Sequence, residues 1–461
     1  MTHLRFDSLS LSPAQLQNLR ALGFETMTDI QAAALPVALA GVDLIGQAKT
    51  GSGKTLAFGL PLINKINPRD FGAQGLVLCP TRELATQVAH EIRRLARYQP
   101  NIKVVVLCGG QSIGAQIGSL EHGGHIIVGT PGRIRDHLRK QTLSLERIST
   151  LVLDEADRML DMGFIDDISH IVGHTPAARQ TFFFSATYPE DIRNLSLQFQ
   201  RSPARIKVED SPDSSLIEQR FFICHSGSRS KSVETLLQCF RPDNAVVFCN
   251  TKDAVRDVAA QLRRSGMAAL ALHGDLEQRD RDQVLIQFRQ QSSRVLVATD
   301  VAARGLDIAD LAAVVNADIP HDPETYLHRI GRTGRAGKQG LALTLLAASE
   351  RFRLDRLADD QTSPLTCDAL ESLPVNQATL PAPSYVTLRI AGGRKDKVRP
   401  GDIVGALTRE EGVKGGAVGK IDVTDYAAFV AVERGVSNRA LQCLIGGKIK
   451  GRKFKVEKLK N

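Results

Sequence analysis

The chain has 461 residues, enough for about three domains, and its apolar fraction of 43% is ordinary for a protein that folds in water. Its formal net charge of +9 favours a polyanionic partner. No apolar run reaches the length of a membrane span, and the N-terminus MTHLRFDSLS lacks the basic and then apolar pattern of a secretory signal. We therefore expect a cytoplasmic protein without a membrane partner.

The first half of the chain alternates short apolar runs with helical stretches. A run of this kind is typical of a strand that is buried on both faces of a parallel sheet. In the stretch 83–98, apolar residues instead recur along one stripe, which predicts a helix. The runs that we expect to form strands are 75–80, 104–110, 125–131, 151–157 and 181–187.

The second half of the chain repeats this alternation, so an α/β fold is predicted for both halves. Polar stretches that contain proline and serine, at 208–219 and 370–384, are typical of linkers. We therefore expect three domains, at residues 1–208, 219–365 and 384–461. The strands expected in the second half are 245–251, 267–275, 294–300, 311–320 and 341–347.

The sequence AKTGSGKT, residues 48–55, lies where an apolar strand end at 42–47 turns into a helical stretch. Backbone N–H groups and the helix dipole favour an anion at such a point. The glycines let the backbone approach a phosphate closely, Lys54 can reach the terminal phosphates, and the Thr55 hydroxyl suits Mg²⁺. The usual pattern begins with glycine where this chain has Ala48. On this motif alone, a flexible Gly/Ser loop stays open as the alternative.

The sequence DEAD, residues 154–157, ends an expected buried strand. Transfer of a phosphoryl group to water requires a metal ion, a positioned water molecule and positive charge on the transition state. Asp154 can hold Mg²⁺ together with Thr55, and the adjacent Glu155 can orient or deprotonate the attacking water. A solvated turn is the alternative, and the phosphate loop upstream makes it a minor one.

Positive charge is available in the sequence HRIGRTGRAG, residues 328–337. Arg332 and Arg335 are three residues apart, so they face the same way if this stretch is helical. The second half has no G-K-[ST] motif of its own, which predicts a single nucleotide in a cleft between the halves. The two arginines then reach its phosphates only when the halves close. A surface loop is the alternative interpretation.

These motifs occur in the same order as in the DEAD-box ATP-dependent RNA helicases. The chain resembles this family over nearly its whole length. The resemblance implies two tandem RecA-like parallel-sheet domains that hydrolyse ATP with Mg²⁺ and locally separate RNA duplexes. The implied partner is RNA and not DNA, and the rival interpretations are a non-catalytic RNA-binding scaffold and a DNA helicase. The other matching motifs are PTRELA (80–85), TPGR (130–133), SAT (185–187), VFCN (247–250), ATDVAARGLD (298–307) and HRIGRTGR (328–335).

For ATP, the resemblance implies that Phe6 packs on the adenine, that Gln31 pairs with its edge and that Asp307 holds the ribose. The nucleotide-binding residues would be Phe6, Gln31, Ala48, Lys49, Thr50, Gly51, Ser52, Gly53, Lys54, Thr55 and Asp307. The catalytic residues would be Lys54, Asp154, Glu155, Arg332 and Arg335, with Thr55 and Asp154 as ligands of the metal.

For RNA, the resemblance implies contacts by hydroxyl groups, arginines and backbone N–H groups at strand ends. Such groups suit phosphates and sugars and carry no sequence code, so we expect the core to bind RNA without sequence preference. Ser185 and Thr187 would couple the two sites. The implied RNA-binding residues of the core are Pro80, Thr81, Arg82, Gly110, Thr130, Gly132, Arg133, Arg281 and Thr299.

The excess positive charge lies in the last segment of the chain. Of the 59 Lys and Arg and the 50 Asp and Glu, residues 384–461 hold 17 and 8, so the remaining 42 basic residues are balanced by 42 acidic ones. In the densest part, 446–460, apolar residues interrupt the charges, which favours the edge of a folded sheet over a disordered tail. The segment's order of elements is β-α-β-β-α-β, which predicts an α+β domain like an RNA recognition motif.

This last domain offers few aromatic side chains for stacking bases on its sheet. Tyr426 and Phe429 are the candidates, so we expect basic side chains to make the main RNA contacts, namely Lys448, Lys450, Arg452 and Lys453. The segment resembles the tail of the bacterial DbpA-type helicases within the same family. That resemblance implies a 23S ribosomal RNA hairpin as the target and a role in assembly of the large ribosomal subunit. A domain that binds every RNA equally is the alternative.

Overall fold

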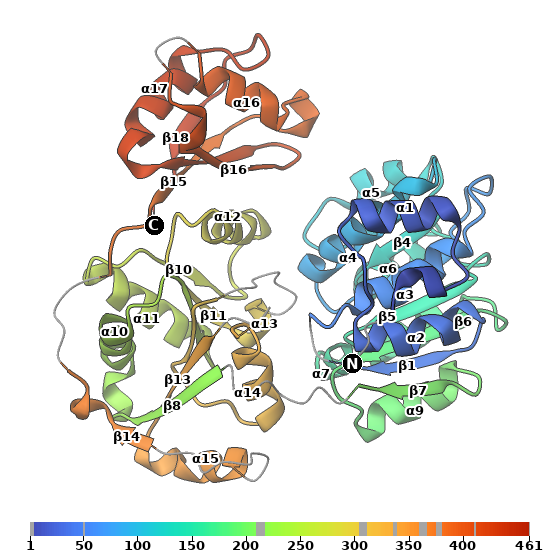
Figure 1. Ribbon diagram of the computed structural model, residues 1–461, viewed down its shortest axis with the longest axis horizontal. Coiled ribbons are helices and arrows are strands. Elements are labelled where there is room, and N and C mark those ends of the chain that lie inside the picture. The colour runs from blue at the N-terminus through green and yellow to red at the C-terminus, as the bar shows by residue number, and fades with distance from the viewer. Residues whose placement is uncertain are drawn as a thin grey trace. The chain divides into compact units, whose positions relative to one another are not determined.

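The computed structural model describes residues 4–48, 51–208, 217–303, 311–334, 339–358, 367–374, 380–409 and 412–460. Three sheets organise this part of the chain (Figure 1). The first sheet belongs to one compact unit, and the second and third sheets belong to another. The predicted fold class, two RecA-like parallel-sheet domains followed by a smaller α+β domain, is confirmed.

The first sheet has seven parallel strands in the order β3-β4-β2-β5-β6-β1-β7. All five runs that were predicted as strands in this half form strands of the sheet. The strands are β1 (Leu44–Gln47), β2 (Gly75–Leu78), β3 (Val104–Leu107), β4 (Ile126–Gly129), β5 (Thr150–Asp154), β6 (Gln180–Ser185) and β7 (Ala204–Lys207). The helices are α1 (Pro13–Ala21), α2 (Asp29–Leu39), α3 (Lys54–Asn64), α4 (Arg82–Leu95), α5 (Ile113–Leu120), α6 (Pro131–Arg139), α7 (Ala156–Asp161), α8 (Ile165–Gly173) and α9 (Glu190–Phe199).

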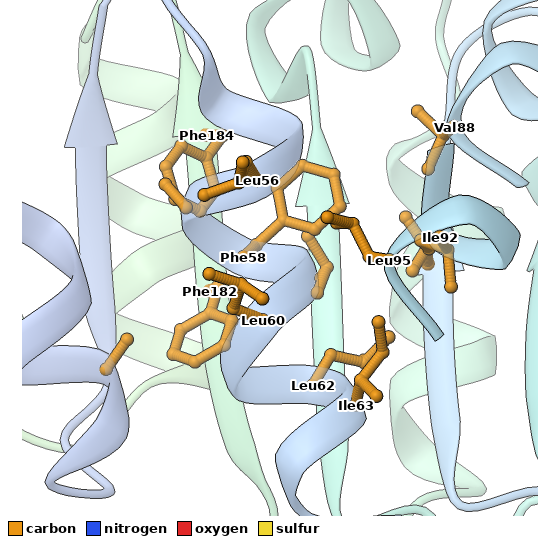
Figure 2. Packing of buried hydrophobic residues seen from close by; sticks show 14 of the residues in the cluster. Leu56, Phe58, Leu60, Leu62, Ile63, Val88, Ile92, Leu95, Phe182 and Phe184 are labelled. Carbon is orange, nitrogen blue, oxygen red and sulfur yellow. The ribbon is translucent and has the colours of Figure 1, made fainter. Parts of the chain in front are cut away.

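Both faces of this sheet are buried, as its continuously apolar strands predict. Along β6, Phe182 and Phe184 pack into one cluster with α2, α3 and α4, whereas Phe183 packs on the other face with α6, α8 and α9. Figure 2 shows Phe182 and Phe184 beside apolar side chains of α3, with the apolar side chains of α4 on the other side of α3 in this view. The predicted helix at 83–98 is α4 followed by a short 3-10 turn, Ala96–Tyr98.

The second sheet also has seven parallel strands, in the order β10-β11-β9-β12-β13-β8-β14. The five predicted strands are present, and β8 and β14 add two strands beside the polar stretches that were interpreted as linkers. The strands are β8 (Ile217–Ile223), β9 (Ala245–Cys249), β10 (Ala269–Leu272), β11 (Val295–Thr299), β12 (Ala313–Asn316), β13 (Gly340–Leu346) and β14 (Cys367–Ala369). The helices are α10 (Arg229–Phe240), α11 (Lys252–Arg264), α12 (Gln278–Arg289), α13 (Asp300–Ala303), α14 (Pro323–Ile330) and α15 (Arg351–Ala358).

The third sheet has four antiparallel strands in the order β16-β17-β15-β18. The predicted order of elements, β-α-β-β-α-β, is confirmed, and the basic end of the chain forms the edge strand β18. One face of the sheet packs on both helices around a buried apolar core. The elements are β15 (Tyr385–Ile390), α16 (Pro400–Leu407), β16 (Val418–Val423), β17 (Ala428–Glu433), α17 (Ser437–Gly446) and β18 (Val456–Lys458).

The domain boundaries proposed from the sequence remain a prediction. Strand β8 begins at Ile217, and β14 lies at Cys367–Ala369, beyond the boundary expected at residue 365. Within the described ranges, the structure contains no helix that is both long and apolar enough to cross a membrane.

The contact between β1 and β6 leaves no room for a side chain at Gly46. A Cβ atom there would lie 2.5 Å from Cε1 of Phe184, whose fully buried ring also packs against Phe58 at a centroid distance of 5.4 Å. We therefore expect Gly46→Ala to lower the free energy of unfolding of the first domain by about 1–3 kcal/mol, the usual cost of overpacking. Hydrogen exchange of β1 and β6 in the full chain under mild urea measures this loss.

The matched control is Gly173→Ala at the end of α8. A Cβ atom at Gly173 meets nothing within 4 Å, so this variant should exchange its β1 and β6 amides at the parent rate. An equal loss of protection in both variants would show that the Phe184 contact is not the cause.

Candidate ATP and RNA sites

The strand order of the first sheet separates the predicted site residues into two groups. Predicted ATP residues follow β1 and β5, which flank β6 with its Ser185, whereas predicted RNA residues follow β2, β3 and β4. Because the strands are parallel, both groups lie at the carboxyl edge of one sheet, where open α/β sheets bind ligands. The ATP group and the RNA group meet where β5 pairs with β2.

The loop between β1 and α3 is shaped for close approach of a phosphate. Gly51 and Gly53 have φ angles of +90° and +95°, a region that favours glycine. A Cβ atom at Gly53 would also lie 2.3 Å from Nε2 of Gln31. Helix α3 begins at Lys54, so its N-terminal N–H groups face the end of this loop. The predicted nucleotide-binding residues Lys49 and Thr50 lie outside the described residues.

Gln31, predicted to read adenine, is hydrogen-bonded to the phosphate loop. Its Nε2 donates to the carbonyl of Gly53 at 3.1 Å, and its Oε1 accepts from the N–H of Thr28 at 3.0 Å. The hydroxyl of Thr28 in turn donates to the carbonyl of Ser52 at 2.7 Å. These bonds use one of the two N–H donors and one of the two oxygen lone pairs of the amide, so a donor and an acceptor remain for the edge of adenine. Phe6 is buried in the apolar core, and its predicted contact with the base stays a prediction.

The positive charge of Lys54 acts on the buried carboxyl group of Asp154. Lys54 is buried and its Nζ donates to the carbonyl of Ala48 at 2.9 Å. Burial raises the pKa of Asp154 to about 7, and the charge of Lys54 acts in the opposite direction. A buried carboxylate of this kind is stabilised by further positive charge, which a divalent cation supplies. Asp154 and the partly buried Thr55 hydroxyl therefore fit the predicted Mg²⁺ ligands.

Glu155 stands in an uncommon backbone conformation directly after β5. Its φ and ψ are both 52°, in the left-handed region, and its N–H donates to Oδ1 of Asp154 at 3.1 Å. A non-glycine residue adopts this conformation at an energetic cost, and such positions cluster at functional sites. The conformation turns the chain from β5 into α7.

Asp157 is a site residue that the sequence reasoning missed. Its Oδ2 accepts hydrogen bonds from the N–H groups of Ala186 and Thr187 and from the Thr187 hydroxyl, each at 3.2 Å. Its own N–H donates to the hydroxyl of Ser185 at 3.4 Å. The last residue of DEAD thus holds the SAT motif in place. The sequence offered one sign of this contact: the runs that form β5 and β6 both end in polar motifs, DEAD and SAT.

The predicted RNA residues of the first domain gather at two helix N-termini. Thr81 caps α4 by accepting from the N–H of Leu84 at 3.3 Å, and Thr130 is the N-cap of α6. Arg133, in the first turn of α6, donates to the carbonyl of Gln111 at 3.0 Å. Pro80 and Arg82 flank Thr81, Gly110 follows β3 with a φ of +71°, and Gly132 lies between Thr130 and Arg133. Helix N-termini and hydroxyl groups are suited to phosphate oxygens.

In the second domain, two predicted RNA residues meet at the end of β11. Thr299 ends that strand, and its hydroxyl accepts from the N–H of Ala302 at 3.4 Å. Arg281, in α12, donates to the carbonyl of the same Ala302 at 3.3 Å. Helix α14 ends at Ile330, so the helical-spacing argument does not apply to Arg332. Arg335 and Asp307 lie outside the described residues.

Arg329 is the second residue that the sequence reasoning missed. Its side chain is only 1% exposed and makes a bidentate pair with Asp300, at 2.7 and 2.6 Å. It also donates to the side-chain oxygens of Asn316 at 3.2 Å and Asn250 at 2.8 Å. One arginine thus ties together the ends of β9, β11 and β12, beside Thr299. Its position within the HRIGRTGR motif indicated a functional residue, but it did not indicate that Arg329 is buried and joins three strand ends.

The predicted basic residues of the third domain lie on an exposed turn. Lys448, Lys450, Arg452 and Lys453 are all exposed, and Lys450 Nζ donates to the carbonyl of Lys397 at 3.2 Å. The turn therefore lies beside a second basic loop that the sequence reasoning missed. We call the two together the basic loop surface, which consists of Arg394, Lys395, Lys397, Arg399, Lys448, Lys450, Arg452 and Lys453.

Tyr426 lies next to this surface. Its side chain is 68% exposed, and Lys395 Nζ lies 4.5 Å from the ring centroid and 2.5 Å from the hydroxyl oxygen. An exposed aromatic ring beside a cation can stack on an unpaired base.

Comparison with known proteins assigns each sheet to a family. The profile described as DEAD/DEAH box helicase matches residues 28–195, helicase conserved C-terminal domain matches 229–337, and DbpA RNA binding domain matches 387–458. The ATP-dependent RNA helicase DbpA of Escherichia coli K12 is 52% identical to the chain over 98% of both proteins. The protein belongs to the DEAD-box ATP-dependent RNA helicases of the DbpA type.

Two further DEAD-box proteins match the helicase part of the chain. The ATP-dependent RNA helicase CshA of Listeria monocytogenes is 46% identical over 78% of this chain and 69% of its own. Among solved structures, Dbp5 of Saccharomyces cerevisiae bound to RNA and ADP BeF3 is 29% identical, with a TM-score of 0.72 over 80% of this chain and 96% of its own. Membership in this family of ATP-dependent enzymes sets aside the interpretation as a non-catalytic scaffold.

The three hydrogen bonds that Oδ2 of Asp157 accepts from the SAT motif of this DEAD-box helicase can be tested directly. Removing a charged acceptor costs about 1.5–3 kcal/mol per bond, so Asp157→Ala should speed amide exchange at Ala186 and Thr187 by about tenfold or more. The Thr187→Val variant removes only one of the donors and should leave these amides near the parent rate. Equal exchange in the parent and Asp157→Ala would show that Asp157 does not hold the SAT motif.

Proposed function

We propose that this helicase uses ATP to separate short RNA duplexes of 23S ribosomal RNA in the cytoplasm during assembly of the large ribosomal subunit. The observation that carries the proposal is the third domain. It matches the DbpA RNA binding domain, and it holds the whole positive excess of the chain. Because the rest of the chain is neutral, attraction to a particular RNA has its source in this domain.

We assign the chemistry of ATP hydrolysis to the carboxyl edge of the first sheet. Lys54 and the loop glycines would bind the phosphates, and Asp154 and Thr55 would hold Mg²⁺, which neutralises charge on the phosphate oxygens when bound. Glu155 would orient the attacking water and accept its proton. Phe6, Gln31 and Asp307 would bind adenosine. Arg332 and Arg335 would stabilise the charge that develops in the transition state, which requires the two helicase domains to come together during the reaction.

We assign RNA binding to two surfaces with different tasks. The strand-end residues of the two helicase domains would bind the RNA backbone without reading sequence, because their donors suit phosphates and sugars. The basic loop surface, with Tyr426, would bind the ribosomal hairpin. Stimulation of ATP hydrolysis by RNA, compared with DNA of the same sequence, measures the preference of these surfaces for RNA.

The separate roles of Lys54 and Glu155 predict different defects. Lys54→Ala should weaken ATP binding, because it removes the phosphate contact. Glu155→Gln should bind ATP normally and hydrolyse it about 10²-fold or more slowly, the usual contribution of a general base. Titration with a fluorescent ATP analogue and an RNA-stimulated ATPase assay separate the two effects. Parent turnover in Glu155→Gln would remove Glu155 from its role.

The ribosomal target is tested by comparing two RNAs of equal length, a 23S hairpin and an unrelated hairpin. The measured quantity is the ratio of their half-stimulating concentrations for ATPase activity at fixed salt. The parent ratio should strongly favour the ribosomal hairpin, because the third domain raises the local RNA concentration at the core. In a full-length variant with Lys448, Lys450, Arg452 and Lys453 changed to Gln, and in a chain that ends at residue 379, the ratio should fall towards one.

Positive charge alone strengthens the binding of every RNA equally and with a steep salt dependence, so its loss lowers both affinities and leaves their ratio unchanged. A ratio that is the same in the parent and in both variants would therefore show that the domain binds RNA without preference. The proposed ribosomal role would then be withdrawn in favour of a general RNA-remodelling helicase with a non-specific tail.

A further inference from the structure

The third domain is joined to the second helicase domain through a buried polar contact at the end of α12. Gln290, directly after this helix, is only 2% exposed. Its Nε2 donates to Oδ2 of Asp422 at 2.9 Å and to the carbonyl of Phe429 at 3.2 Å. Its Oε1 accepts from the hydroxyl of Thr387 at 2.9 Å. One amide side chain thus bonds to three strands of the third sheet.

Two further side chains extend this contact on both sides of Gln290. The hydroxyl oxygens of Ser292 and Thr387 lie 2.8 Å apart, and both residues are buried. On α12 itself, Gln287 Nε2 donates to the carbonyl of Lys460 at 3.2 Å. Every polar side chain named here has a partner, which is the condition for a polar contact to be stable when water is excluded.

A small apolar cluster completes the interface. Ile286 of α12 is buried together with Ala427 and Phe429 of the third domain, and Leu459 packs against them. In this cluster Ile286 is the one member from the helicase domain. Its burial therefore depends on the third domain being docked, and a polar residue there should not disturb the helicase core.

The docked surface is the outer face of the third sheet. Phe429 pairs with Asp422 on one side and with Arg389 on the other, so these side chains share the face opposite the core that packs on α16 and α17. In an RNA recognition motif, this is the face on which bases stack. Here α12 covers it, while the basic loop surface and Tyr426 remain exposed.

Helix α12 therefore carries two functions. Arg281, a proposed RNA contact of the core, lies in the first turn of this helix. The residues that contact the third domain begin at Ile286 in α12 and end at Ser292, shortly after the helix. Nine residues separate Arg281 from Gln290, which is about 14 Å along a helix. A helix fixes this separation, whereas a flexible tether would let it vary.

We propose that α12 is a spacer that holds the hairpin-binding domain at a set distance from the RNA strand bound by the second helicase domain. The inference rests on the proposed function for its two RNA contacts. It predicts that the enzyme selects not only a hairpin but also the number of nucleotides between that hairpin and the strand on which the core acts.

The test uses the full chain and a series of RNAs in which the ribosomal hairpin is joined to a single strand through spacers of increasing length. For the parent, the half-stimulating RNA concentration should pass through a minimum at one spacer length and rise about tenfold on either side. In Ile286→Ser/Gln290→Ala, the docked contact is lost and this dependence should flatten. Binding of the isolated hairpin should stay within about twofold of the parent, because the basic loop surface is unchanged.

The matched control is Arg289→Gln, which changes an exposed residue at the same end of α12. It should keep the parent optimum. Hydrogen exchange of residues 284–292 and 424–432, without RNA, should rise in the double variant and stay at the parent level in the control. This readout tests the docked contact independently of any RNA.

The outcomes separate the two proposals. A parent that prefers the ribosomal hairpin but responds equally to all spacers would overturn the spacer role of α12, as would a double variant that keeps the parent optimum. Equal exchange in the parent and the double variant would overturn the docked contact itself. A parent without any hairpin preference would contradict the proposed function, whereas the exchange comparison would still decide whether the domain is docked.

Discussion

The parallel pairing of β5 with β2 on one side and β6 on the other determines where the candidate sites of the first domain lie. Parallel strands bring their carboxyl ends to one edge, so motifs far apart in the sequence become neighbours. Strand β5 stands at the boundary between the ATP group and the RNA group. Its end carries Asp154 and Glu155, and Asp157 follows in α7. The DEAD motif therefore lies between the two groups of predicted binding residues.

The electrostatics of this edge follow from burial. A carboxyl group inside a protein resists ionisation, and the elevated pKa of Asp154 reflects that cost. Lys54 offsets part of it, and the remainder favours a bound cation. In the second domain, a buried charge is stabilised by protein groups. There the buried charge of Arg329 is fully partnered by Asp300, two asparagines and the carbonyl of Asp318, which makes it a fixed structural element instead of a binding group.

The sequence predicted most of the fold and the location of the sites, but not the contacts between distant elements. Continuous apolar runs predicted the central strands because burial on both faces leaves a local pattern. Strand β8 was missed because it begins within a polar stretch, and β14 was missed because it has only three residues and ends directly before one. Asp157 and Arg329 were visible only as members of motifs, since their partners are supplied by other strands.

The basic loop at 394–399 was missed because the charge in the last segment is densest elsewhere. The contact of α12 with the third domain has no recognisable pattern in the sequence, because Gln287, Gln290 and Ser292 are ordinary residues at a helix end. Their role depends on a domain about one hundred residues further along the chain. A polar interface of this kind can be found only from the structure, whereas the phosphate loop follows from local chemistry.

We propose that ATP and RNA bind along this one sheet edge and that each ligand changes the affinity for the other. This proposal is tested most directly by measuring RNA affinity with and without a non-hydrolysable ATP analogue, and affinity for the analogue with and without RNA. Thermodynamic linkage requires the two ratios to be equal, and the account predicts that each lies between about 5-fold and 150-fold. If each ligand binds with the same affinity whether or not the other is present, the two groups of residues do not form a coupled site and the account is wrong.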